Sequence, residues 1–416
     1  MPITRSRQLI SDCLVSEVGA QWDFLAGLVR DPTDNPPGDC AAVAESWARR
    51  LEELGYNVER HGVPSDLARK HGMLSVTNLV VRQRFGDGPT IALNAHGDVV
   101  PPGDGWTTAP YGAEIHDGQM YGRGAAVSKC DIATYTWVLR SLREIRHALK
   151  GSVELHITFD EETGGALGPK WLLDEGIVRP HFTICAGFSY HVVVAHNGCL
   201  HLEVEVRGRQ AHAAIPDTGV DALQVATDIL SAIYEHRETL TSRKSNVEGI
   251  GSPTLVVGLI NGGINTNVVP DVVTFRLDRR LIPEESGMEV EREVTSLIEQ
   301  TASAHSAAQV RVRRVLLAQP LTPIAGSDKL ADVLCRNATV VMGEPIPAQG
   351  VPLYTDARHY SAAGVPTVLY GAGPRTLLES RAKNADERIA LCDLEKATKA
   401  VAFSVAELLS GATADV

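Results

Sequence analysis

The sequence lacks the features that mark several classes of protein. Its seven cysteines are scattered, odd in number and without Cys-x-x-Cys spacing, a pattern typical of reduced cytoplasmic thiols and not of a disulfide framework. No basic block or aromatic-interleaved patch is present and the net charge is −12, so we expect neither nucleic acid nor an acidic membrane as a partner. There is no uninterrupted apolar run for a signal peptide or a membrane span. We therefore expect a soluble, cytoplasmic protein.

The composition is that of an ordinary globular protein, but the chain is longer than a domain with a single compact core usually is. The chain has 416 residues, which predicts two domains. In the first third, segments with helical periodicity alternate with apolar, strand-like runs: helices at 40–56, 131–149 and 165–177, strands at 78–85, 90–100 and 151–160. This alternation predicts an α/β domain with a mixed, partly parallel sheet and helices on both faces.

The pattern changes near residue 200. Strands with one polar face and two amphipathic helices follow, at 201–214, 219–240, 254–262, 272–281, 287–305 and 308–317. Such strands predict a small α+β domain whose sheet is open on one side. From residue 318 onwards helices and short strands return. We therefore predict a host domain in two parts, residues 1–199 and 318–416, interrupted by an inserted domain at 200–317.

Two polar phrases end neighbouring strands of the predicted α/β domain, where open sheets collect ligands. "NAHGDVV" contains His96 and Asp98, and "TFDEETGG" contains Asp160, Glu161 and Glu162. Residues two apart on a strand face the same side, so we expect Asp98 to accept from one ring nitrogen of His96 and to leave the other for a metal or a substrate. Adjacent carboxylates repel unless a cation lies between them. The acidic run therefore predicts metal ligands or a general base, with a solvated turn as the structural alternative.

Together with phrases along most of the chain, these residues resemble the di-zinc amidohydrolases that include acetylornithine deacetylase, succinyl-diaminopimelate desuccinylase, aminoacylase and carboxypeptidase G. The resemblance rests on "HGDVVPPGDGWTTAPYGAEIHDGQMYGRGA", "TFDEETGG", "AHNG", "RQAHAAIPDTGVDAL", "NTNVVPDVVTFRLDRR", "YTDARHY", "GVPTVLYGAGP" and "ADE", which occur in the family's order. It implies a zinc-peptidase-like catalytic domain, an inserted dimerisation or lid domain, a homodimer, and hydrolysis of C–N bonds other than in long peptides.

The same resemblance shows where this sequence departs from the family. Of the five protein ligands to the family's two zinc ions, His96 and Glu162 are retained, and Glu161 stands in the place of the general base. Three family ligand positions hold other residues: Val127 for the bridging aspartate, Ala186 for a glutamate and Lys383 for a histidine. Zinc sites normally need at least three protein ligands, so we expect no metal or a single divalent metal here, and not two zinc ions.

The three replacements change the charge of the site in one direction. Two carboxylates become Val127 and Ala186, and a neutral imidazole becomes the cation Lys383. These changes offset the loss of two divalent ions. We expect the ammonium of Lys383 to lie between Glu161 and Glu162 and to supply part of the positive charge of a zinc ion.

Other side chains near these positions could complete a single-metal site. Asp131 follows the bridging position by one helical turn, with a helix N-terminal charge as its structural alternative. His191 and Cys185 flank the position of the lost glutamate. Cys130, at the predicted start of a helix, is either a thiol activated by the helix terminus or a buried, inert one.

The resemblance also implies residues that bind the substrate. His212 matches a histidine that stabilises the oxyanion across the family's dimer, and Asn267 and Arg280 match contacts to the substrate carboxylate. The planar guanidinium of Arg280 suits that role because it binds a carboxylate in two places. We interpret the neighbouring Arg279 as a solvated strand residue. Four further residues are expected at the pocket: Thr355, Asp356, Gly371 and Gly373. The two glycines lie in a turn whose backbone can approach a ligand closely. These residues predict a small substrate that bears a carboxylate.

The sequence leaves four functions open. The first is an atypical, metal-free or metal-depleted hydrolase of an amide-like or cyclic C–N bond, with Glu161 as general base and Asp98, His212 and Lys383 assisting. The second is a lyase or isomerase in which Glu161 and Lys383 transfer a proton. The third is a non-catalytic paralogue that binds a metabolite. The fourth is a conventional di-metal deacylase that uses substitute ligands.

Overall fold

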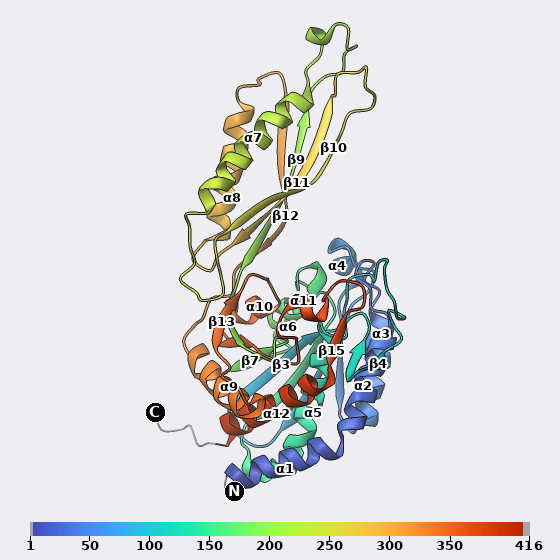
Figure 1. Cartoon of the computed structure of the whole chain (residues 1–416), viewed down its shortest axis with the longest axis vertical. Coiled ribbons are helices and arrows are strands. Elements are labelled where there is room, and N and C mark those ends of the chain that lie inside the picture. The colour runs from blue at the N-terminus through green and yellow to red at the C-terminus, as the bar shows by residue number, and fades with distance from the viewer. Residues whose placement is uncertain (1–2, 411–416) are drawn as a thin grey trace. The chain divides into compact units, whose positions relative to one another are not determined.

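The computed structural model describes residues 3–410, and the chain divides into two compact units (Figure 1). The first unit contains the chain up to Val194, then Pro323–Gln349 and the segment from Thr355 onwards. The second unit comprises Ala195–Thr322 and the short segment Gly350–Tyr354, which the sequence pattern placed in the host domain. The second unit thus interrupts the first one in the sequence.

The first unit is built on an eight-stranded mixed sheet. In spatial order its strands are β1 (Val58–Gly62), β2 (Thr77–Arg84), β6 (Ser152–Thr158), β3 (Thr90–His96), β7 (Phe182–Cys185), β14 (Thr367–Leu369), β8 (Val192–His196) and β13 (Ala348–Val351). β3 runs parallel to both of its neighbours, β6 and β7, whereas β1, β2 and β6 pair antiparallel. A smaller sheet contains β15 (Arg388–Ala390), β5 (Gln119–Tyr121) and β4 (Glu114–His116).

Helices pack against the larger sheet and against one another. They are α1 (Ile3–Ser16), α2 (Val18–Arg30), α3 (Ala41–Glu53), α4 (Ser65–Lys70), α5 (Lys129–Leu142), α6 (Pro169–Asp174), α9 (Ser327–Met342), α10 (Ala357–Ala362), α11 (Leu377–Ser380) and α12 (Leu391–Leu409), with 3-10 turns at Arg143–Ala148 and Glu161–Thr163. α5 lies between β3 and β6 on one side and α1, α2 and α12 on the other, so nearly all of its residues are buried. The hydroxyl of Ser128, just before α5, accepts from the backbone NH of His96 at 3.1 Å and donates to its carbonyl at 3.0 Å. This pair of hydrogen bonds fixes the start of α5 at the carboxyl end of β3.

The mixed α/β class predicted from the sequence is confirmed. The nearly continuous apolar run at 90–100 forms β3, and β6 alternates apolar residues with Glu154 and His156. Both strands are buried from their second residue onwards because helices and neighbouring strands enclose them. Two helices are shorter than their periodicity predicts. The helix expected at 131–149 ends at Leu142 and continues as a 3-10 turn, and the one expected at 165–177 begins only at Pro169. Within residues 3–410 we find no helix with the length and apolarity required to cross a membrane.

The second unit is a four-stranded antiparallel sheet with two helices along one face (Figure 1). Its strands, in spatial order, are β10 (Thr254–Gly262), β11 (Val272–Leu281), β9 (Gly198–Arg207) and β12 (Gln309–Ala318), its helices are α7 (Ala222–Leu240) and α8 (Gly287–Ala302), and a 3-10 turn spans Pro216–Thr218. Leu200, Leu202, Val204 and Val206 alternate along β9 and join the apolar core beneath the helices. The odd-numbered residues of β9 therefore face the side of the sheet that carries no helix.

Candidate active site

The predicted metal-ligating residues meet at the carboxyl edge of the large sheet. His96 ends β3, and its register partner Thr158 ends the neighbouring parallel strand β6. Glu161 and Glu162 follow β6 in a 3-10 turn, so the two phrases reach the same edge. One donor atom from each of His96, Glu161 and Glu162 lies within 4.8 Å of the others. Parallel pairing of β3 and β6 is thus what assembles this cluster.

Asp98 is fully buried, and its carboxylate chiefly holds the acidic turn in place. Its two oxygens accept hydrogen bonds from the backbone NH groups of Glu161 at 3.2 Å and Glu162 at 3.1 Å, and from the side chain of Asn35 at 2.9 Å. The ring Nδ1 of His96 lies closer to the backbone carbonyl of Asp98, at 2.9 Å, than to its carboxylate, at 3.4 Å. The ring pairing expected from the sequence is therefore made mainly by the main chain. The other ring nitrogen, Nε2, faces Glu161 Oε2 at 3.9 Å.

The surroundings of this cluster raise the pKa values of both His96 and Glu162. Burial alone would lower the pKa of His96, but the hydrogen bond to Asp98 and the carboxylates of Glu161, Asp98 and Glu162 raise it to about 10. Burial and the nearby Glu161 raise the pKa of Glu162 to about 7, and Lys383 opposes that rise. Carboxylates crowded in a poorly solvated place favour any positive charge that can reach them. The cluster is therefore suited to bind a cation.

The structure places the ammonium of Lys383 on this cluster. Its Nζ lies 2.5 Å from Glu162 Oε2, and the carboxylate is almost completely buried while the lysine side chain is 48 % exposed. The residue follows α11 and has a positive φ of 63°, which turns the chain back toward the site. Lys383 thus places its charge on Glu162, one of the residues predicted from the sequence as a metal ligand.

Glu387 is a central residue that sequence reasoning missed. It forms a buried ion pair with Arg123 at 2.6 Å, and both side chains are 1 % exposed. Its other oxygen accepts from the backbone NH groups of Ala126 at 3.1 Å and Val127 at 3.2 Å. Glu387 therefore joins the loop that carries Val127 to the segment that carries Lys383. The phrase "ADE" was the signal that could have found it, but a glutamate beside an aspartate in a loop has no distinctive spacing.

The substitute ligands considered from the sequence have other partners. Asp131 is buried, and its Oδ1 accepts from the backbone NH of Ala372 at 2.6 Å. His191 stacks on Phe188 with ring centroids 4.7 Å apart, and burial lowers its pKa to about 4. The metal-ligating cluster of this unit, within residues 3–410, contains neither side chain.

The two cysteines of this region are buried thiols. Burial raises the pKa of Cys130 well above its ordinary value, and its thiol donates to the carbonyl of Ala126 at 3.3 Å. Burial, with the nearby carboxyl of Asp356, raises the pKa of Cys185 in the same direction. Burial of the thiol thus outweighs the effect of the helix terminus, and Cys130 matches the buried, inert alternative.

The residues expected at the pocket rim lie closer to the protein interior than predicted. Asp356 is buried, and a Cβ atom at Gly165 would lie only 2.0 Å from its Oδ1. A Cβ atom at Gly371 would lie 1.9 Å from Asp131 Oδ1, and one at Gly373 would lie 2.4 Å from the carbonyl of Gly187. These glycines thus admit neighbouring protein groups, and this contact explains them without a ligand. Thr355 lies at the start of α10, where its hydroxyl accepts from the backbone NH of Ala357 at 3.2 Å.

The second unit carries the remaining predicted residues. His212 and Asn267 are both exposed. Their segments are adjacent, since the backbone NH of Ala213 donates to the carbonyl of Asn267 at 3.0 Å. Arg280 donates from Nε and Nη2 to both oxygens of Asp278, at 3.0 and 3.1 Å. The interpretation of Arg279 as a solvated residue was wrong. Its side chain is fully buried and pairs with Glu285 at 2.6 Å, because alternation along β11 turns position 279 into the core and position 280 to the opposite face.

Comparison with known proteins identifies the family. A family model described as peptidase family M20/M25/M40 matches residues 92–407. The chain belongs to this family. The prediction of a hydrolase that acts on C–N bonds is thereby confirmed, and the family usually binds divalent metals such as zinc.

Curated relatives match over most of the chain. Acetylornithine deacetylase from Myxococcus xanthus is 28 % identical over 366 residues, which cover 87 % of this chain and 90 % of that protein. Succinyl-diaminopimelate desuccinylase from Rhizorhabdus wittichii is 29 % identical over 371 residues, which cover 86 % of this chain and 90 % of that protein.

Solved structures share the fold at lower identity. The di-peptidase Dug1p from Saccharomyces cerevisiae superposes with a TM-score of 0.78 at 12 % identity, over 98 % of this chain and 99 % of that one. The M20 family metallo-carboxypeptidase Sso-CP2 from Sulfolobus solfataricus gives 0.75 at 17 %, over 93 % and 99 %. The YXEP protein of Bacillus subtilis, described as a dinuclear metal binding peptidase, gives 0.67 at 16 %, over 95 % and 99 %.

Proposed function

We propose that this protein hydrolyses the amide bond of a small acylated amino acid at a centre that holds at most one divalent cation. The observation that carries the proposal is the contact between the Lys383 ammonium and Glu162, at the edge of the cluster that also contains His96 and Glu161. The names of the curated relatives, a deacetylase and a desuccinylase, support a small acyl group as the part that is removed.

The donor set fits one divalent cation better than two. His96 and Glu162 supply an imidazole nitrogen and a carboxylate oxygen, which are donors that zinc accepts and which lie close enough to share one ion, and Glu161 lies beside both of them as the carboxylate left for the base. A second ion would need a bridging carboxylate, and the residue expected to bridge is Val127, whose backbone NH is held by Glu387. It would also have to displace Lys383 from Glu162. An ammonium and a divalent cation compete for the same carboxylate, so we infer that Lys383 replaces the second metal.

Glu161 is the general base in this proposal. A divalent cation, when bound, supplies Lewis acidity that polarises an amide carbonyl and acidifies water. Glu161 accepts a proton from the attacking water and delivers it to the leaving amine. Asp98 holds the turn that carries Glu161, because its carboxylate accepts from the backbone NH of that residue. Lys383 stabilises the negative charge that develops on the carbonyl oxygen.

Arg280, Asn267 and His212 are the proposed contacts for the rest of the substrate. Arg280 pairs with the carboxylate of Asp278 in two places, and the same planar guanidinium suits a substrate carboxylate that displaces Asp278. Asn267 and His212 are exposed neighbours and can donate to polar groups of a ligand. A small substrate with a free carboxylate matches these side chains.

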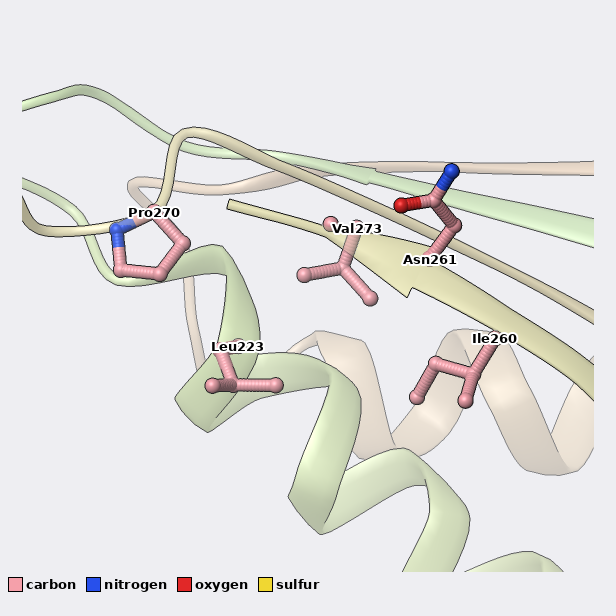
Figure 2. Close-up of a pocket in the computed structure, with 6 residues that line it drawn as sticks. Leu223, Ile260, Asn261, Pro270 and Val273 are labelled. Carbon is pink, nitrogen blue, oxygen red and sulfur yellow. The ribbon is translucent and has the colours of Figure 1, made fainter. Parts of the chain in front are cut away.

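We also propose a homodimer that forms through the second unit. β10 is an edge strand of its sheet and exposes Val256, Leu259 and Ile260 by 54 %, 62 % and 55 %. Beside it lies a shallow hollow, lined by Leu223, Ile260, Asn261, Gly262, Pro270 and Val273. Figure 2 shows Leu223 of α7 and Ile260 of β10 at the border of this hollow. An apolar edge strand of this kind favours pairing with a second copy.

A cytoplasmic location and a small-molecule partner complete the proposal. All seven cysteines fall within residues 3–410, and none of them forms a disulfide there, which supports a reducing compartment. The net charge of −12 disfavours nucleic acid and acidic membranes as partners.

A substrate panel with one catalytic variant tests the function. N-acetyl and N-succinyl amino acids are incubated with the protein in the presence of manganese or zinc, and release of the free amine is followed. We expect turnover of at least one class, and Glu161→Gln should lower kcat/KM by at least about a hundredfold. Glu175→Gln, an exposed glutamate after α6, is the matched control and should change nothing. Undiminished activity of Glu161→Gln would refute the assignment of the base.

The fate of solvent oxygen separates hydrolysis from the other reactions. In water enriched in oxygen-18, hydrolysis places the label in the carboxylate product. Turnover without the label would instead indicate proton transfer as in a lyase or isomerase. Thermal stabilisation by the acyl amino acids without any turnover would indicate a binding protein.

A further inference from the structure

Three metal-ligating side chains meet on the second unit, apart from the site described above. Cys199 and His201 lie two residues apart on β9 and face the same side, and Asp278 lies directly opposite His201 on β11. The thiol sulfur of Cys199 is 3.1 Å from Nε2 of His201. Asp278 Oδ2 is 2.9 Å from the same nitrogen and 3.8 Å from the sulfur. The register of two paired strands therefore creates this cluster.

The cluster lies on the face of the sheet that carries no helix. Cys199 is buried, while the side chains of His201 and Asp278 are 34 % and 31 % exposed. Leu200 and Leu202, the alternate residues of β9, point into the core on the other face. One ligand atom is thus held firmly and two can be reached from solvent, which gives an ion a path of entry.

In the absence of a metal, hydrogen bonds link these groups, and the Cys199 thiol donates to Asp278 Oδ2 at 3.8 Å. Nε2 of His201 faces both the Cys199 sulfur and the Asp278 oxygen, yet it carries at most one proton and can donate to only one of them. Once the thiol and Nε2 are deprotonated, three atoms with lone pairs converge on one small space. A cation in that space would accept electron pairs from all three atoms at once.

The spacing of the three atoms matches a tetrahedral metal. Bond lengths of about 2.3 Å to sulfur and about 2.1 Å to nitrogen or oxygen separate the ligand atoms by about 3.4–3.6 Å. The separations of 3.1, 2.9 and 3.8 Å differ from these values by about half an ångström or less. Small rotations of the exposed side chains would close that difference.

We propose that Cys199, His201 and Asp278 bind one thiophilic divalent cation of the zinc class, with a fourth position open to water or to another ligand. A thiolate, an imidazole and a carboxylate together form a donor set that selects zinc or cobalt over magnesium or calcium. Arg280 holds both oxygens of Asp278, so the cation would compete with this guanidinium for the carboxylate. Binding should therefore be strengthened when the guanidinium is removed.

Cobalt titration of the full-length protein tests this site directly. A thiolate bound to cobalt gives an intense charge-transfer absorption in the near ultraviolet, and the His96, Glu161 and Glu162 cluster contains no sulfur. The readout is thus independent of the proposed catalytic centre. We expect the band to grow to a saturating intensity equivalent to one thiolate-bound cobalt ion per chain, whatever further cobalt binds at the sulfur-free cluster, and zinc should displace it.

Three variants identify the ligands. Cys199→Ser should abolish the band, and His201→Gln should raise the Kd for cobalt at least about tenfold because one of three ligands is lost. Arg280→Met should lower that Kd. Cys392→Ser, which removes an exposed cysteine, is the control and should leave the titration unchanged.

The remaining outcomes decide against the site. Absence of the band in the parent protein at saturating cobalt would overturn the proposal, and so would a band that survives Cys199→Ser. His201→Gln alters a partly exposed side chain, so it keeps the test decisive if Cys199→Ser fails to fold. An unchanged Kd in His201→Gln would also contradict the assignment.

Discussion

Removal of the Lys383 charge should have opposite effects on stability with and without metal. Lys383 lies 2.5 Å from Glu162, whose carboxylate is 5 % exposed and next to Glu161. In the absence of metal, Lys383→Met leaves this buried carboxylate without its partner. The variant should therefore be less stable than the parent protein. When a divalent cation is present, the freed carboxylate is available as a ligand.

The magnitude follows from the distance and the exposure. Two unit charges whose centres lie about 4 Å apart, as in an ion pair in contact, attract by about 4 kcal/mol at an effective dielectric constant of about 20 and by about 1 kcal/mol in water. The lysine side chain is 48 % exposed, so solvent screens it, and we take about 2 kcal/mol as the attraction. A cation that binds Glu162 must overcome this amount. Lys383→Met should therefore lower the Kd for a divalent cation by about thirtyfold.

Manganese titration measures this effect with little interference from the cysteine-containing cluster, because carboxylates and imidazole suit manganese better than a thiolate does. Lys170→Met is the matched control, since Lys170 pairs with Asp174 on the exposed surface of α6. The parent protein and the control should bind manganese equally, and Lys383→Met should bind it more tightly. If Lys383→Met and the control differ by less than threefold, Lys383 does not compete with a metal and the reasoning fails.

Three further results are expected from the same geometry. Glu387→Gln leaves the buried guanidinium of Arg123 without its partner and should lower the free energy of unfolding by about 3 kcal/mol, measured by urea denaturation. Burial and the neighbouring Arg358 lower the pKa of His359 to about 3. The unfolded chain takes up this proton below about pH 6.5 and the native one does not, so stability should fall by about 2 kcal/mol between pH 7 and pH 5, and His359→Gln should remove that part of the loss. Gly371→Ala places a Cβ 1.9 Å from a buried carboxylate oxygen and should lower the melting temperature, whereas Gly19→Ala, with no atom within 4 Å, should not.

The parts of the fold and site that could be predicted depend on local patterns. The nearly continuous apolar run at 90–100 predicts β3 because strands enclosed on both faces are mostly apolar, and the alternation along β9 predicts a sheet with one polar face. His96 and Glu162 were predicted to lie together because both follow strands that pair in parallel.

The rest depends on contacts between segments distant in the sequence. Glu387 reaches Arg123, 264 positions away, and no pattern near either residue announces that ion pair. Arg279 and Arg280 are adjacent and chemically alike, and only the direction of the β11 pleat decides which of them is buried. Asp131 and Gly371 are a further pair of residues far apart in the sequence that the fold brings together. The glycine leaves room for a carboxylate 240 residues away, a contact that no pattern near either residue predicts.

The most direct test of the central claim is the zinc content of the catalytic centre. Cys199→Ser removes the proposed thiolate site, so zinc retained by this variant reports on the cluster of His96, Glu161 and Glu162. The variant is dialysed against zinc, then against metal-free buffer, and zinc per chain is measured by elemental mass spectrometry. We predict no more than one zinc ion per chain, and Lys383→Met in the same background should retain it more fully. Two zinc ions per chain would contradict the account, because they would show that the centre assembles the family's metal pair despite Val127, Ala186 and Lys383.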